Sequence, residues 1–163
     1  MVIKYEPLNR RERIVRLFRE AIEAENRNDL ETAKRKLDEI LHESFKAEPE
    51  FYFEACFRLA DIFVQEDNYR GAVKCALQAI SRAPSNDHYR LGLKRLGGIL
   101  EIMKVRGRLS DLTENMESTL KLIEEDEELH RFVKALIRLA RGERVEESFS
   151  LEEFNEVIRA LSG

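Results

Sequence analysis

The chain has 163 residues, enough for one domain, and 37% of them are charged, against about 25% in an average globular protein. The 28 basic and 32 acidic residues give a formal charge of −4, which excludes the strong positive field that recruits nucleic acid. No stretch approaches the roughly 18 apolar residues of a membrane span, and the N-terminus lacks the apolar run of a signal peptide. We therefore expect a cytoplasmic protein, and its many Glu and Arg with few Gln are typical of a thermophile.

The first part of the chain predicts a lead-in and a helical hairpin. Residues 1–8 are expected to be irregular. A helix is predicted over about 9–27, where apolar residues recur three or four positions apart. Asn28-Asp29 ends this helix and can cap a second helix over about 30–45.

Residues 53–86 carry the most specific pattern in the chain. Small and apolar residues fall three or four apart on one helix and then on a second, so each helix has a single apolar face. Asn68 can cap the second helix, and Pro84 must end it. The spaced residues are Cys56-x2-Leu59-Ala60-x2-Phe63, then Tyr69, Ala72-x3-Ala76, Ala79 and Pro84.

This spacing resembles the tetratricopeptide repeat, a 34-residue helical hairpin with the pattern aromatic-x2-Leu-small-x2-aromatic, then Ala-x3-large, then Pro. Two positions depart from that pattern, because Cys56 replaces the usual aromatic residue and Ala76 replaces a larger apolar one. The resemblance implies an all-α helical-hairpin solenoid, or α-α superhelix, whose role is to hold a partner.

The rest of the chain extends the helical pattern. A helix is predicted over about 87–105 and a partner helix over about 109–123. A further helix is predicted over about 124–141, and Ser150-Leu-Glu-Glu153 forms a capping box for a last helix. We expect about eight helices and no sheet, arranged as three tetratricopeptide-like hairpins in 9–125 (9–45, 50–83 and 86–123) and C-terminal capping helices in 126–163.

The first helix of each hairpin lines the concave side of such a solenoid. The predicted groove is apolar at one end and more polar at the other, and an exposed apolar groove is normally occupied. A protein or peptide partner is one occupant, and the chain's own C-terminal helix, from the same or a second copy, is the other. The predicted partner-binding residues are Val15, Phe18, Ile22, Glu54, Phe57, Arg58, Asp61, Val64, Leu91 and Lys94.

One subtype of the family has a recognisable groove. Repeats that grip the carboxylate tail of chaperones carry a Lys and an Asn on the first repeat, an Asn on the second, and a Lys and an Arg on the third. Here those positions hold Phe18, Ile22, Arg58, Lys94 and Gly98, so only Lys94 agrees. The chain is therefore not expected to be a chaperone-tail clamp.

No catalytic, cofactor or metal site is expected. His42, His88 and His130 lie at helix ends without a second ligand one turn away. Cys56 and Cys75 lack metal-type spacing and are expected to be reduced packing residues. The glycines form no phosphate-binding loop, and no nucleophile lies in a recognisable motif. The expected function is a non-catalytic adaptor or scaffold.

Two other functions stay open. Arg10, Arg11, Arg13, Arg16 and Arg19 form a basic stripe that could meet phosphates, which would make the chain a nucleic-acid-associated regulator. Neighbouring Glu residues on the same helix balance this stripe, and we favour that interpretation. The second alternative is a self-associating protein, such as a homodimer, whose groove is filled by its own last helix.

Overall fold

The computed structural model describes residues 8–163, so all but the last residue of the expected irregular lead-in lies outside the described part. Within residues 8–163 the chain forms eight α-helices and one 3-10 helix, and no strand. The prediction of an all-α protein with about eight helices and no sheet is thereby confirmed. The elements are α1 (Arg10–Asn26), α2 (Leu30–Ser44), α3 (Pro49–Gln65), α4 (Tyr69–Ser81), α5 (Asn86–Val105), the 3-10 helix η1 (Leu109–Thr113), α6 (Glu117–Leu122), α7 (Glu127–Ala140) and α8 (Glu152–Ser162).

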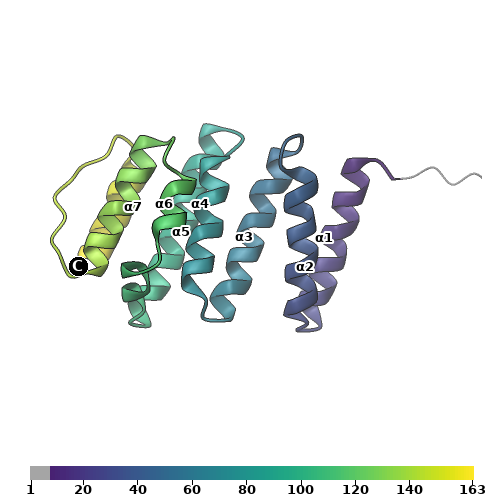
Figure 1. Cartoon of the computed structure of the whole chain (residues 1–163), viewed down its shortest axis with the longest axis horizontal. Coiled ribbons are helices and arrows are strands. Elements are labelled where there is room, and N and C mark those ends of the chain that lie inside the picture. The colour runs from purple at the N-terminus through teal and green to yellow at the C-terminus, as the bar shows by residue number, and fades with distance from the viewer. Residues whose placement is uncertain (1–7) are drawn as a thin grey trace, which may run out of the picture.

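The helices follow one another along the long axis of the molecule (Figure 1). Each of the first four helices packs against the next, and α8 returns to pack against α5 and α7. One continuous hydrophobic core runs between the helices for the length of the row, and Phe53, Tyr69 and Phe132 are among its fully buried side chains. No helix within residues 8–163 is long and apolar enough to cross a membrane.

Four helices end in the same kind of turn. In each turn one residue has a positive φ, and the next residue donates its amide to a carbonyl five positions earlier, as in a Schellman motif. The amide of Asp29 donates to the Ala24 carbonyl at 2.8 Å, and that of Asn68 donates to the Phe63 carbonyl at 2.8 Å. The residues with positive φ are Asn28, Asp67, Gly107 and Gly142.

The caps that follow the first two turns also match. The Asp29 side chain accepts a hydrogen bond from the Thr32 amide at 3.2 Å, and the Asn68 side chain accepts one from the Gly71 amide at 3.1 Å. Both side chains satisfy an amide that the first helical turn leaves without a partner. The α1–α2 and α3–α4 connections therefore have the same local geometry, as the sequence predicts.

The third connection differs, and the prediction of one continuous helix over 109–123 is wrong. Arg108 stands where the earlier turns have Asp or Asn, and no side chain caps the helix that follows. The chain forms a 3-10 turn there, and Asn115 then takes a φ of 58°, which an α-helix cannot contain. The short helix α6 begins only after that break.

The capping box predicted at Ser150 is also absent. Helix α8 has Leu151 at its N-cap, with no side-chain hydrogen bond to the helix. The Ser150 hydroxyl and amide instead donate to the Glu128 carboxylate on α7, at 2.7 and 2.8 Å. Ser150 therefore ties the segment before α8 to α7 rather than starting the helix.

Candidate functional site

One face of the row is built from α1, α3 and α5. A hollow of about 480 Å³ lies on this face, which we call the odd-helix face, and two ion pairs bridge its helices. Arg58 Nη1 on α3 lies 3.0 Å from Glu25 Oε2 on α1, and Arg95 Nη1 on α5 lies 3.4 Å from Glu54 Oε1 on α3. The hollow is lined by Glu25, Glu54, Phe57, Arg58, Asp61, Arg95, Gly98, Ile99 and Ile102.

The floor of the hollow is aromatic. Phe57 is only 4% exposed and packs edge-on against Phe53, with ring centroids 5.1 Å apart. The guanidinium of Arg95 lies 5.0 Å from the centroid of the Phe57 ring, in a cation–π contact. Phe57 therefore supports the hollow from below and offers a partner much less apolar surface than its sequence position predicts.

Asp61 is the carboxylate of this hollow that has no ion pair with any residue of the described chain. Loss of hydration raises the pKa of Asp61 above its usual range, although the nearby positive charges of Arg95 and Arg58 oppose that rise. The side chain remains open to solvent on its outer side. A partly desolvated, unpaired carboxylate is thus presented at the centre of the odd-helix face.

Large apolar side chains flank this centre. Val15 and Ile22 on α1, and Leu91 and Ile102 on α5, are between 37% and 46% exposed. On each helix the two residues are separated by two or three full turns, so they point to the same side. These four make up half of the large apolar residues that are exposed in the described chain, the others being Leu8, Phe45, Val105 and Leu122.

The remaining predicted binding residues lie in different surroundings. Phe18 is half-buried against Phe51, with ring centroids 5.8 Å apart, and Val64 is half-buried at the core edge. Lys94 lies in a separate hollow of about 220 Å³ between α5 and α8. The structure thus brings Glu54, Phe57, Arg58 and Asp61 into one hollow, and places Lys94 in the next.

Five residues of the hollow are not among the predicted binding residues: Glu25, Arg95, Gly98, Ile99 and Ile102. Ile102 lies on the same side of α5 as Leu91, so extending the helical period by one more turn would have found it. Arg95 and Ile99 face α3, and no local signal in the sequence shows that Arg95 reaches Glu54.

Helix α8 extends the row and leaves the Asp61 hollow open. A Cβ added at Gly97 would lie 3.1 Å from Val157 Cγ2, so the missing side chain lets α8 approach α5 closely. Arg90 on α5 pairs with Glu153 on α8 at 3.3 Å, and Lys104 Nζ donates to the Ala160 carbonyl at 3.0 Å. The described residues of α8 contribute nothing to the lining of the Asp61 hollow.

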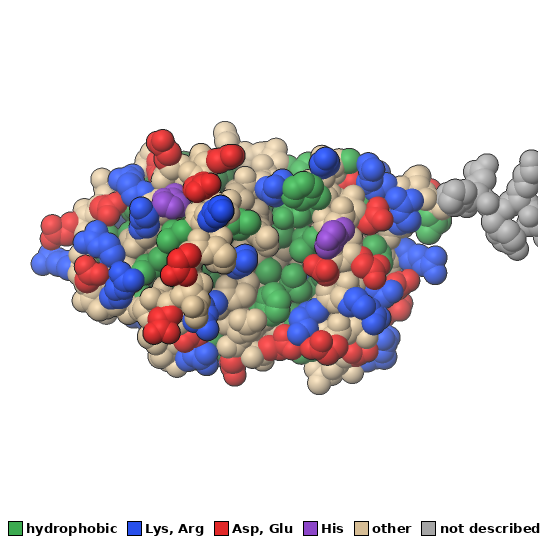
Figure 2. All heavy atoms as spheres, in the orientation of Figure 1, with side chains coloured by type: hydrophobic (Ala, Val, Ile, Leu, Met, Phe, Trp, Pro, Cys, Tyr) green, Lys and Arg blue, Asp and Glu red, His purple; other side chains and the backbone are tan. Residues whose placement is uncertain are grey.

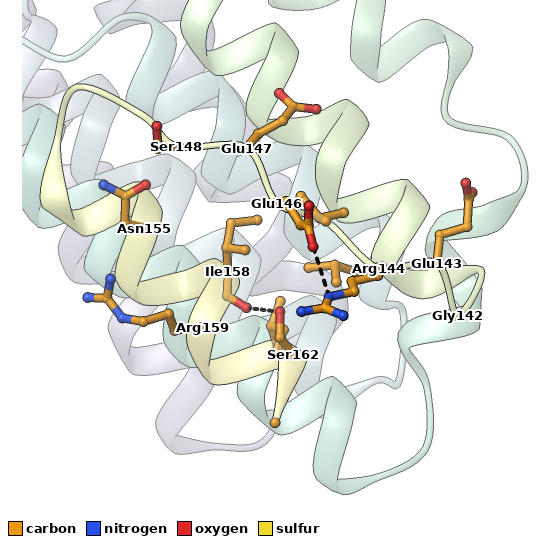
Figure 3. Close-up of a pocket in the computed structure, with 14 residues that line it drawn as sticks. Gly142, Glu143, Arg144, Glu146, Glu147, Ser148, Asn155, Ile158, Arg159 and Ser162 are labelled. Carbon is orange, nitrogen blue, oxygen red and sulfur yellow. Dashed lines mark hydrogen bonds and ion pairs between the residues drawn. The ribbon is translucent and has the colours of Figure 1, made fainter.

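Another hollow lies at the far end of the row, between α7, the following loop and α8 (Figure 3). Its volume is about 1030 Å³. The charged side chains at its edge pair with one another: Arg144 with Glu146 at 3.2 Å and Arg138 with Glu147 at 3.3 Å. These pairs leave the hollow without a distinctive group to recognise a ligand.

The basic stripe of α1 is partly neutralised. Arg11 pairs with Glu48 at 2.7 Å, Arg13 pairs with Glu43 at 3.1 Å, and Arg16 pairs with Glu20 on its own helix. On the side of the molecule with α2 and α4 in front, charged side chains of both signs are interspersed, and apolar ones form a band between these two helices (Figure 2). Neither observation favours a phosphate-binding surface.

The structure also shows the surroundings of the candidate chemical groups. Cys56 and Cys75 are both buried, and burial raises the pKa of the Cys75 thiol to about 12 and that of Cys56 further still. Such thiols are poor nucleophiles at neutral pH. Residues 8–163 contain no group of three or more His, Cys, Asp or Glu placed to hold a metal ion.

No family model, no curated protein and no solved structure matches this chain.

Proposed function

We propose that this chain is a non-catalytic protein-interaction adaptor, which holds a segment of a partner protein on the odd-helix face. The observation that carries the proposal is that Val15, Ile22, Leu91 and Ile102 are all exposed and apolar on the odd-helix face, where Ile102 lines the hollow. Exposed apolar surface costs free energy in water, so its concentration on a single face is typical of a binding surface.

We further propose that the chain is a tetratricopeptide-like solenoid. The repeated turn geometry at Asn28 and Asp67, with matching caps at Asp29 and Asn68, supports this assignment. The hairpins α1–α2 and α3–α4 are the regular repeats of such a solenoid. In the third, η1 and α6 replace the second helix, and α7 and α8 complete the end of the row.

A peptide-display selection tests the adaptor function. A random 12-residue library is selected on the full chain, and the enriched peptides are measured against Ile102→Glu, which places a charge at the rim of the hollow. The matched control is Leu122→Glu on α6, because Leu122 is 41% exposed against 38% for Ile102 and lies outside the face. We expect Ile102→Glu to lose peptide binding and the control to keep it. A library that gives no enrichment, or peptides that bind both variants equally, would contradict the proposal.

A further inference from the structure

The charges of the Asp61 hollow do not balance. Three carboxylates and two guanidiniums line it, and each guanidinium is already engaged. Arg58 pairs with Glu25 at 3.0 Å, and Arg95 pairs with Glu54 at 3.4 Å. Within residues 8–163, no basic nitrogen lies within ion-pair distance of Asp61. One negative charge therefore remains at the centre of the face.

The two arginines are not free to move to Asp61. The Arg95 guanidinium lies over the rings of Phe57 and Phe53, at 5.0 and 5.7 Å from their centroids. Leaving that position would break both the cation–π contacts and the ion pair with Glu54. Arg58 joins α3 to α1 through Glu25, so its release would remove a bridge between these two helices. Asp61 is therefore available to pair with a basic group of a bound partner.

The neighbours of Asp61 specify what else the partner carries. Ile22 on α1 and Ile102 on α5 lie on the two helices that flank α3, and both are exposed. The Arg58–Glu25 and Arg95–Glu54 ion pairs join α3 to α1 and to α5. A segment that crosses α3 therefore meets an apolar, an acidic and again an apolar side chain.

We propose that the partner segment carries a Lys or Arg side chain that pairs with Asp61, and an apolar side chain on each side of that basic residue. This inference rests on the proposed function, and it names the chemistry of the partner. The partial loss of hydration that raises the pKa of Asp61 adds to this argument, because a charge with fewer water contacts gains more from a hydrogen-bonded counterion.

The same display selection also tests this inference, through the sequences of the enriched peptides and the contribution of their basic residue to binding. The enriched wild-type pool should be rich in Lys or Arg flanked by apolar residues. A labelled peptide from that pool, and its Lys→Gln or Arg→Gln analogue, are then titrated against the wild type, Asp61→Asn and the control Glu124→Gln, whose side chain is exposed on another part of the row. The basic residue should strengthen binding about tenfold on the wild type and the control, and have little effect on Asp61→Asn.

Each outcome has a distinct meaning. Enriched peptides without a basic residue, or an equal effect of that residue on the wild type and Asp61→Asn, would overturn this inference and leave the adaptor function standing. A selection without enrichment would overturn both. A wild-type dimer that Asp61→Asn converts to a monomer in sedimentation would assign the hollow to a second copy of the chain, and would overturn the inference of a foreign partner.

Discussion

The packing of α5 against α4 can be tested by making the same Gly→Ala substitution at two positions of α5. Gly92 is buried, and a Cβ added there would lie 2.7 Å from Ile80 Cγ1 on α4 and 3.4 Å from the Phe53 ring on α3. Gly98 lies in the Asp61 hollow, and an added Cβ there would meet nothing within 4 Å. We therefore expect Gly92→Ala to destabilise the fold relative to Gly98→Ala.

The expected difference in the free energy of unfolding between Gly92→Ala and Gly98→Ala has two contributions. Replacing Gly by Ala inside a helix stabilises it by about 1 kcal/mol, and this term is the same at both positions. Overpacking a closed core typically costs about 1–3 kcal/mol, and this term applies only at Gly92. Ile80 is fully buried, and its clashing atom lies on the stiff inner part of a β-branched side chain, so it cannot swing away. The difference between the variants should therefore be about 1–3 kcal/mol.

Urea unfolding at 25 °C, followed by circular dichroism, measures this difference. With a slope of about 2 kcal/mol per molar urea, the midpoint of Gly92→Ala should lie roughly 0.5–1.5 M below that of Gly98→Ala. The midpoint of Gly98→Ala should lie at or above that of the wild type. Equal midpoints for the two variants would refute the close approach of α4 and α5 at Gly92.

Two further predictions concern the turns and the hollow. Asp29→Ala and Asn68→Ala each remove the capping acceptor of a helix and should lower the free energy of unfolding by about 1 kcal/mol, while an unchanged urea midpoint would show that the caps contribute nothing. The folded-state pKa of Asp61 lies above its unfolded value, so the native state binds the extra proton, and this group makes the fold less stable as the pH rises through that interval. Asp61→Asn should therefore be more stable than the wild type at pH 7, and the advantage should disappear at pH 3; a variant less stable at pH 7 would contradict the raised pKa of this carboxylate.

Local signals in the sequence were sufficient to predict most of the helices. Asn28-Asp29 and Asn68 mark turns whose hydrogen bonds all lie within a few residues, so the chain positions alone reveal them. The same approach failed at 109–123, because apolar periodicity does not show that Arg108 cannot cap and that Asn115 breaks the helix. Helical period predicts which side of a helix a residue takes, but it does not predict where the helix ends.

Contacts between distant residues account for the other errors. Ser150 fits a capping box, yet its hydroxyl bonds to Glu128, which lies on another helix. The stripe of residues on α1, α3 and α5 was predictable from their spacing, whereas the pairing of Arg95 with Glu54 was not. The unpaired state of Asp61 follows only when every neighbouring charge is placed, and that requires the tertiary structure.

The position of α8 has a consequence for the order in which the chain folds. From α1 to α5 each helix packs on the one before it, so these contacts join residues that are close in sequence and can form as soon as each helix is complete. The second half of α5 is different, because Lys104 and Gly97 meet residues of α8 that follow them by about 60 positions in the chain. During synthesis the α1–α4 end can therefore assemble first, while the Gly97 side of α5 stays exposed until α8 has left the ribosome. A chaperone or an early aggregate would be expected to engage the nascent chain at that temporary surface.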